Sequence, residues 1–306
     1  MTQRNPLVLV DASIYIFRAY FSLPERWHSP EGYALNAVYG YASFLLDLLQ
    51  EPTLAGSVDL AAAFDESLGT CFRNQLHADY KCSRELPDEA LAYQLKACRH
   101  ITEVLQIPCY GGSRFEADDY LASLSRLARQ REQASCIVTR DKDLGQLLLT
   151  ADDELWDYAA GARMNRDGFK AKYGVWPEQF ADYLGLVGDK IDDIPGVPAV
   201  GAKTALQLLQ AWPSLEHLSY NLDRIPATGI RGAARIATNL EQHWQQALIS
   251  RGLAQLADAI PDLDLPQAFQ LRAGAVGELL AYLEAINITG GLLARCRNLL
   301  QRLERR

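Results

Sequence analysis

The sequence predicts an α/β fold built on a doubly wound parallel sheet, followed by a helical lobe. Three short apolar runs, at residues 7–11, 59–65 and 135–141, each end in an acidic residue and are typical of buried parallel strands. Segments with the helical spacing of apolar residues lie between these runs. After residue 158 the strand pattern stops, and a glycine- and proline-containing segment at 188–205 leads into further helices.

The elements can be assigned in order along the chain. Short apolar runs predict strands at residues 7–11, 59–65, 107–110, 135–141 and 154–158. A helix or turn is predicted at residues 14–20. Helical patterns predict helices at residues 35–49, 88–105, 116–131, 143–149, 167–173, 177–187 and 203–209. Because strands alternate with helices up to residue 158, the first lobe is expected to hold the parallel sheet.

Acidic residues gather at one edge of this predicted sheet, where the carboxyl ends of parallel strands meet and ligands bind. Three of them end strands, three begin the helix at 116, and one follows two residues after a strand end. They are Asp11, Asp65, Glu116, Asp118, Asp119, Asp141 and Asp143. Helix capping and dipole compensation, the latter worth about 0.3–1 kcal/mol per acid, are the alternative explanation. So many converging carboxylates repel one another, which favours a bound cation.

The composition limits the kind of protein. The 306 residues are 49% hydrophobic, which is enough for a full core and two lobes. None of the six cysteines has zinc-site spacing and the five histidines are scattered, so we expect reduced thiols, a cytoplasmic protein and no histidine metal site. We expect neither a signal peptide nor a membrane span. The formal charge of −8 by itself disfavours a nucleic-acid partner.

The segment 188–205 predicts a helix–hairpin–helix. Its prolines and glycines break any helix, and a new helix starts near Lys203. A tight turn before a helix N-terminus leaves backbone N–H groups free, and such groups can hold a phosphate. An ordinary helical hairpin turn is the alternative.

Taken together, ordered motifs over residues 7–260 resemble the 5′-nuclease superfamily: 5′→3′ exonucleases, flap endonucleases and the N-terminal nuclease domain of bacterial DNA polymerase I. The motifs are Leu9-Val10-Asp11 with Arg18-Ala19-Tyr20, Ala63-Phe64-Asp65, Phe72-Arg73 with Tyr80-Lys81-Cys82-Ser83-Arg84, Glu116-Ala117-Asp118-Asp119, Thr139-Arg140-Asp141-Lys142-Asp143, and the block from Gly188-Asp189 to Lys203-Thr204-Ala205. Asp193 and Ala199 depart from the family pattern, which usually has Asn and Gly there.

The resemblance implies a PIN-like nuclease core with a helical arch at about 70–95, and a helix–hairpin–helix lobe. We expect domains at 1–165 and 166–260, with a helical extension at 261–306. It also implies a stand-alone enzyme, because the sequence leaves no room for a polymerase domain.

The implied site holds two Mg²⁺ or Mn²⁺ ions, which prefer oxygen ligands. One ion is assigned to Asp11, Asp65, Glu116, Asp118 and Asp119, and the other to Asp141, Asp143, Asp189 and Asp192. Without these acids and Asp193 the rest of the chain is near neutral, so DNA affinity is expected from local basic sites.

The resemblance also implies contacts to DNA. Lys81 and Arg84 would contact the scissile phosphate from the arch and join Asp118 as catalytic residues, while Tyr80 would stack on a base. The other DNA-binding residues are expected to be Arg18, Gly196, Gly201, Lys203 and Thr204. The backbone carbonyls of Pro195, Val197 and Val200 are expected to hold K⁺.

The expected function is therefore a metal-dependent 5′→3′ exonuclease or flap endonuclease that acts on DNA ends, flaps and junctions as a monomer. Two alternatives stay open. The first is a structure-specific DNA-binding protein without catalysis, against which the complete carboxylate set argues. The second is a PIN-type ribonuclease, which lacks a hairpin like that at 195–201.

Overall fold

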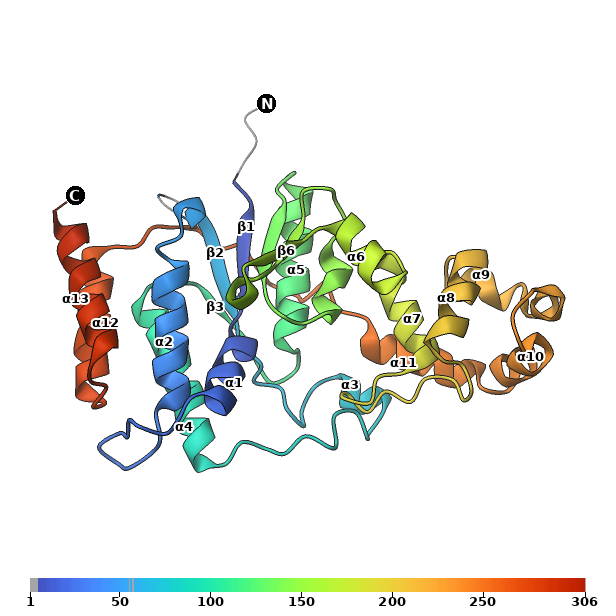
Figure 1. Ribbon diagram of the computed structural model, residues 1–306, viewed down its shortest axis with the longest axis horizontal. Helices are drawn as coiled ribbons and strands as arrows, with labels where there is room; N and C mark the ends of the chain where they lie inside the picture. Colours follow the sequence, from blue (N-terminus) through green and yellow to red (C-terminus); the bar gives the residue numbers. More distant parts are fainter. Residues whose placement is uncertain (1–4, 55, 57, 306) are drawn as a thin grey trace.

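A mixed sheet forms the centre of the protein, in a computed structural model that describes residues 5–54, 56 and 58–305 (Figure 1). The strand order is β3-β2-β1-β4-β5-β6, and β7 adds to β2. The strands are β1 (Leu7–Asp11), β2 (Val58–Ala63), β3 (Cys109–Tyr110), β4 (Ser135–Val138), β5 (Glu154–Asp157), β6 (Ala162–Met164) and β7 (Ala268–Phe269). The first five are parallel, as the sequence predicted. β6 and β7 are antiparallel and were not predicted.

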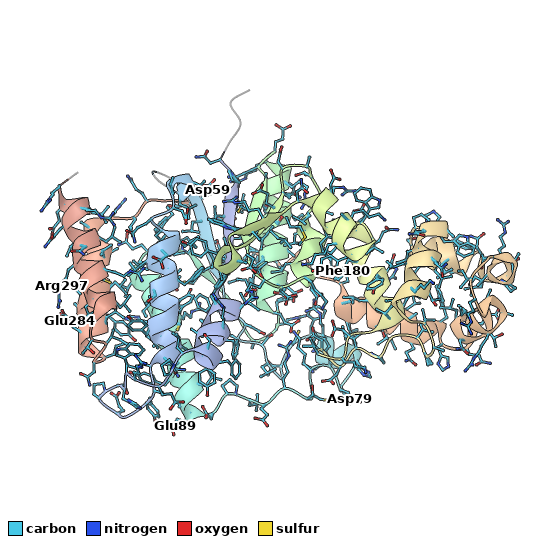
Figure 2. The ribbon with its side chains drawn as sticks, viewed as in Figure 1. Asp59, Asp79, Glu89, Phe180, Glu284 and Arg297 are labelled. Carbon is cyan, nitrogen blue, oxygen red and sulfur yellow. The ribbon has the colours of Figure 1, made fainter. Side chains whose placement is uncertain are left out.

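Two hydrophobic cores lie on the two faces of this sheet. Side chains alternate across a strand, so Leu7 and Leu9 of β1 enter one core while Val8 and Val10 enter the other. The first core continues from α5 (Ala117–Gln130) into the second lobe without a break. Phe180, labelled in Figure 2, is 1% exposed and belongs to this shared core. The two lobes are therefore packed together as one body.

The second face is covered by helices from both ends of the chain. They are α1 (Ala12–Ser22), α2 (Asn36–Leu48), α4 (Glu89–Val104), α12 (Ala273–Ala285) and α13 (Gly291–Glu304). The hairpin of α12 and α13 packs on α2 and α4 at the end of the molecule opposite to the second lobe (Figure 1). Residues after 261 thus contribute to the core of the first lobe.

The predicted helical arch contains little helix. Between Cys71 and α4, only α3 (Arg73–Leu76) is helical, and residues 77–84 form successive turns before an extended stretch. Asp79, labelled in Figure 2, is exposed on one of these turns. This segment runs beneath the carboxyl edge of the sheet and links α3 to α4 (Figure 1).

The second lobe is helical, as predicted. Its helices are α6 (Arg166–Tyr173), α7 (Phe180–Val187), α8 (Ala202–Ala211), α9 (Leu215–Ser219), α10 (Ala233–Gln242) and α11 (Trp244–Ala254). The 3₁₀ turns in the described part of the chain are η1 (Pro52–Leu54), η2 (Asp143–Leu147), η3 (Tyr158–Ala160), η4 (Pro177–Gln179) and η5 (Leu222–Ala227). Across the described residues, every helix is too short or too polar to cross a membrane.

Candidate metal centre and nucleic-acid interface

Three acids follow the carboxyl ends of neighbouring strands, as the sequence predicted. Asp11 ends β1 and accepts hydrogen bonds from Ile14 N (3.3 Å) and Thr139 Oγ1 (2.8 Å). Asp65 follows β2 and accepts from Ser67 N and Oγ. Asp141 follows β4, and its Oδ1 accepts from Asp143 N (2.8 Å). The side-chain oxygens of these three carboxylates accept hydrogen bonds from neutral donors.

The pKa shifts show that these carboxylates crowd one another. Burial, Asp141 and Asp65 raise the pKa of Asp11 to about 7. Burial and the charges of Asp141 and Asp11 raise the pKa of Asp118, in the first turn of α5, well above its usual range. Burial and the charges of Asp141 and Asp192 raise the pKa of Asp143 to about 7. Asp11, Asp118, Asp141 and Asp143 therefore lie close enough together to disfavour one another's charged form.

Basic residues hold the remaining acids. Glu116 is 5% exposed and receives hydrogen bonds from Arg73 Nη1 (2.8 Å), from Tyr80 Oη (3.0 Å) and from Lys81 Nζ. Asp189 accepts from Lys142 Nζ (2.8 Å), and Asp192 accepts from Arg84 Nη2 (2.5 Å). Lys81 and Arg84 of the arch thus lie at the two acidic groups, next to the strand-end carboxylates.

Asp119 does not point into this site, so its assignment as a metal ligand was wrong. Its side chain is fully buried, and both oxygens bind the guanidinium of Arg73 at 2.7 Å. The same oxygens also accept from Glu116 N (3.0 Å) and Ala257 N (2.8 Å). Four donors saturate this carboxylate, which leaves no lone pair aimed at an ion.

The residues of the site fit divalent cations with oxygen ligands. Within the described part of the chain, no three acidic, histidine or cysteine side chains are arranged to hold an ion as they stand. However, Oδ1 of Asp143 is buried and accepts no hydrogen bond, although Lys142 Nζ lies 3.3 Å away. Together with the mutual elevation of the pKa values, this orphaned oxygen is consistent with a group of oxygen ligands whose crowding a bound cation would relieve.

Two residues of the first lobe that were predicted to contact DNA lie in different surroundings, one buried and one exposed. Tyr80 is 4% exposed and its ring belongs to the core, so stacking on a DNA base was a wrong prediction. Arg18 is exposed on α1 and lines a cavity of about 430 Å³ with Tyr15, Tyr39 and Tyr158. It stands seven residues past Asp11, about 10 Å along the helix, outside the carboxylate group.

The hairpin exposes some of the predicted backbone groups and buries others. Gly196 N donates to Ser250 Oγ (3.0 Å), and Gly196 O accepts from Gln246 Nε2 (2.6 Å). A Cβ on Gly196 would lie 2.3 Å from Gly188 N, so this glycine is required by packing and its amide is not free for a phosphate. Its assignment to DNA binding was therefore wrong.

Gly201 has a different role. Its φ is −92°, and a Cβ there would meet no atom within 4 Å, so the fold itself accepts other residues at this position. It caps the N-terminus of α8, followed by the exposed Lys203 and the half-buried Thr204. The start of α8 is consequently open to close approach by a ligand.

The three carbonyls predicted to hold K⁺ lie in the same turn. Val197 O accepts from Val200 N (3.1 Å). Across the described residues, no hydrogen bond is made to the carbonyl oxygens of Pro195 and Val200. These two acceptors are available for a ligand.

Sequence reasoning missed two contributions. Arg73 was noted only as part of a motif, although it binds both Glu116 and Asp119. Asp193 has a left-handed φ of 54° and accepts from Ser83 N (2.9 Å) and Ser83 Oγ (2.7 Å), which fastens the hairpin segment to the arch. The only sequence signal for this contact was that Asp193 departs from the family pattern, which usually has Asn there. Both Asn and Asp tolerate the left-handed conformation.

Comparisons with known proteins agree with this architecture. Residues 6–174 match the family described as "5'-3' exonuclease, N-terminal resolvase-like domain", and residues 175–274 match "5'-3' exonuclease, C-terminal SAM fold". DNA polymerase I of Pseudomonas aeruginosa is 37% identical over 86% of this chain, which spans 28% of that protein. A 5′-3′ exonuclease of Buchnera aphidicola is 30% identical, and the match covers 85% of this chain and 89% of that protein.

A solved structure shares the fold. The bacteriophage T5 flap endonuclease, in a complex with DNA and metal ions, has a TM-score of 0.63 and 18% identity, covering 98% of this chain and 99% of that one. The sheet with its helical second lobe, the match along both parts of the chain and the identity to relatives of similar length lead to one conclusion. The chain belongs to the 5′-3′ exonuclease family.

Proposed function

We propose that this protein is a metal-dependent 5′→3′ exonuclease and flap endonuclease, which hydrolyses phosphodiester bonds of DNA at 5′ ends and branched junctions. The observation that carries the proposal is the group of crowded carboxylates at the carboxyl edge of the sheet, with Lys81 beside Glu116. The relatives named 5′-3′ exonuclease and the T5 enzyme with DNA and metal ions support it.

Eight acids are proposed to hold two divalent ions, Mg²⁺ or Mn²⁺. They are Asp11, Asp65, Glu116 and Asp118 in one group, and Asp141, Asp143, Asp189 and Asp192 in the other. When bound, two such ions activate a water molecule and stabilise the leaving 3′-oxygen. The protein's part is to gather carboxylates where the metal ions would bind. Its basic side chains lie beside these carboxylates, where the metal ions would replace them as partners.

The arch supplies fixed positive charge to the same place. Lys81 has a side chain only 10% exposed, and its backbone N–H donates to Asp192 O (3.1 Å), so the turn that carries it is fastened to the site. We propose that its ammonium contacts the scissile phosphate as negative charge develops there. Arg84, whose side chain is 39% exposed, would contact the phosphate from the outer side.

The hairpin is proposed to hold the duplex next to the cut. The backbone N–H groups at the start of α8, with Lys203 and Thr204, suit a phosphate of the duplex. The carbonyls of Pro195, Val197 and Val200 suit a weakly hydrated cation such as K⁺, which would then offer positive charge to DNA. We also propose that the enzyme acts as a monomer in the cytoplasm.

Digestion of a 5′-labelled flap substrate tests the function. With Mg²⁺, the wild-type protein should release short 5′-labelled products, whose lengths separate exonucleolytic from flap cleavage, and EDTA should stop the reaction. DNA binding without any product would support the non-catalytic alternative. Cleavage of a matched RNA strand alone would support a PIN-type ribonuclease.

A further inference from the structure

Arg73 is buried at the base of the arch and makes an unusually complete set of hydrogen bonds. Its side chain is 1% exposed. Nε donates to Leu253 O (2.8 Å), and Nη2 donates to Gln255 O (2.8 Å) and Asp119 Oδ1 (2.7 Å). Nη1 donates to Asp119 Oδ2 (2.7 Å) and Glu116 Oε2 (2.8 Å). All five N–H donors of the guanidinium are used, which a lysine ammonium cannot reproduce.

Three distant segments meet at this guanidinium. Arg73 lies in α3, Glu116 and Asp119 begin α5, and Leu253 to Ala257 lead out of α11. Figure 1 shows α3 and α11 side by side, in agreement with these bonds. Asp119 reaches the last segment directly, since its Oδ1 accepts from Ala257 N (2.8 Å). The base of the arch, the metal site and the second lobe are thereby joined at one buried point.

The same contacts fix the orientation of Glu116. Its Oε2 accepts from both Arg73 and Tyr80, while Oε1 faces Lys81. Its backbone N–H donates to Asp119 Oδ2 (3.0 Å). Arg73 thus holds the side chain of this residue and Asp119 holds its backbone, while Oε1 is paired with Lys81, which lies 3.9 Å from Asp192.

We propose that the Arg73–Asp119 pair is a positioning device, which orients Glu116 toward the bound metal and holds the second lobe in register with the metal site. This inference rests on the proposed function for the identity of Glu116 as a ligand. Arg73 and Asp119 are then positioning residues that touch neither metal nor DNA. Residues that hold metal ligands in this way typically change metal affinity or activity by about 10–100-fold when replaced.

The test compares Asp119→Asn and Arg73→Lys with a matched control, Asp153→Asn. Asp153 is a buried acid that accepts backbone N–H bonds from Ser135, Leu149 and Thr150, next to the amino ends of β4 and β5. Mn²⁺ affinity is measured by electron paramagnetic resonance without DNA, kcat and KM on a flap substrate, and Tm by calorimetry. Both site variants should bind Mn²⁺ about 10–100-fold more weakly and lose kcat with little change in KM.

The control separates positioning from stability. Asp153→Asn should lower Tm while Mn²⁺ affinity and kcat, measured well below Tm, stay at wild-type values. If Asp119→Asn and Arg73→Lys behave like this control, the pair is merely structural and the proposal is overturned. If Asp119→Asn alone weakens Mn²⁺ binding, Asp119 is a ligand and the proposal is again overturned.

Two further outcomes remain decisive. If Asp119→Asn does not fold, Arg73→Lys, which keeps the charge, carries the test. If wild-type protein binds Mn²⁺ but cleaves no flap, the proposed function fails, while the positioning role is still judged from Mn²⁺ affinity.

Discussion

The acids at the carboxyl edge of the sheet are chemically alike, but their surroundings give them different roles. Asp119 is neutralised by Arg73, whereas Asp118, one residue earlier, faces Asp11 and Asp141. Neighbours on a helix point in directions about 100° apart, so one side chain enters the core while the next enters the site. Spacing alone could not separate these roles, because the deciding partner, Arg73, lies in another segment of the chain.

Asp118→Asn should abolish cleavage while DNA binding survives. The substitution removes a ligand charge and several kcal/mol of transition-state stabilisation, but it also lessens repulsion of phosphate. Single-turnover cleavage and binding titrations with a flap substrate check both parts. Asp152→Asn removes the same charge from an exposed position and should change neither. Near-normal turnover of the Asp118 variant in Mg²⁺ would contradict the assignment.

Lys81→Ala should lower the rate more than it weakens binding. A fixed cation next to developing charge typically contributes about 10²–10³-fold to the rate. Comparing kcat with the dissociation constant of the flap complex measures the two effects. Arg84→Ala, at the more exposed position, should lose less rate. If only the dissociation constant of Lys81→Ala changed, Lys81 would be a tether.

Ala199→Gly should make the protein slightly more stable. Ala199 has a φ of 63°, and the left-handed conformation costs an L-residue about 1–2 kcal/mol. Glycine removes this strain from the folded state. It also makes the unfolded chain more flexible, which lowers the free energy of unfolding by about 0.4–1 kcal/mol. The free energy of unfolding should therefore rise by about 0.5 kcal/mol. Urea unfolding measures it. Ala202→Gly, at the start of α8, is the control and should be destabilising. A loss of stability for Ala199→Gly would show that its strain is relieved elsewhere.

At the scale of elements, the hairpin before α8 contains two glycines that the fold requires and one glycine that it does not require. Gly188 and Gly196 have left-handed φ values and touch each other's backbone. Gly201 has neither constraint, so the fold itself does not require glycine there. A substitution at Gly201 therefore probes binding without disturbing the turn.

Gly201→Val should weaken duplex binding and leave Mn²⁺ binding intact. The added side chain projects into open space at the start of α8, where it would block a phosphate. Losing one phosphate contact should reduce the slope of log affinity against log salt by about 0.9. Affinities measured over a range of KCl concentrations give this slope. Gly274→Val, a similarly open position in α12 at the far end of the molecule, is the control. Identical slopes for wild type and Gly201→Val would make the hairpin only a structural turn.

Local pattern explains which elements could be predicted. β1, β2 and β4 are mostly apolar runs because both faces of the sheet are covered, and such runs stand out in a sequence. β7 has two residues and exists only because β2 offers an open edge at Val58 and Asp59. The arch was expected to be helical, but its turns are set by contacts such as Ser83 with Asp193. Pairings between distant segments leave no periodic signal in the sequence.

At the scale of the whole molecule, the last two helices are part of the first lobe's core. Leu292, Leu293 and Leu299 of α13 are buried on the face shared with α2. Full burial of each such side chain contributes about 1.5–3 kcal/mol. The hairpin of α12 and α13 therefore contributes to the stability of the first lobe.

Leu292→Ala should destabilise the protein by about 2–5 kcal/mol, because a fully buried leucine leaves a cavity. Thermal unfolding followed by circular dichroism measures the loss. Leu300→Ala on the same helix is half-buried and should cost clearly less. Equal Tm values for wild type and Leu292→Ala would show that α13 is dispensable to the core.

The pairing of β7 with β2 also bears on how the protein is made. Residues 58 and 269 are sheet neighbours, so the second lobe is an insertion within the first. During synthesis from the N-terminus, the inserted lobe leaves the ribosome while the sheet still lacks β7, α12 and α13. The lobe that is started first is thus completed after the second one, and the apolar face of α2 and α4 stays uncovered until α12 and α13 have emerged.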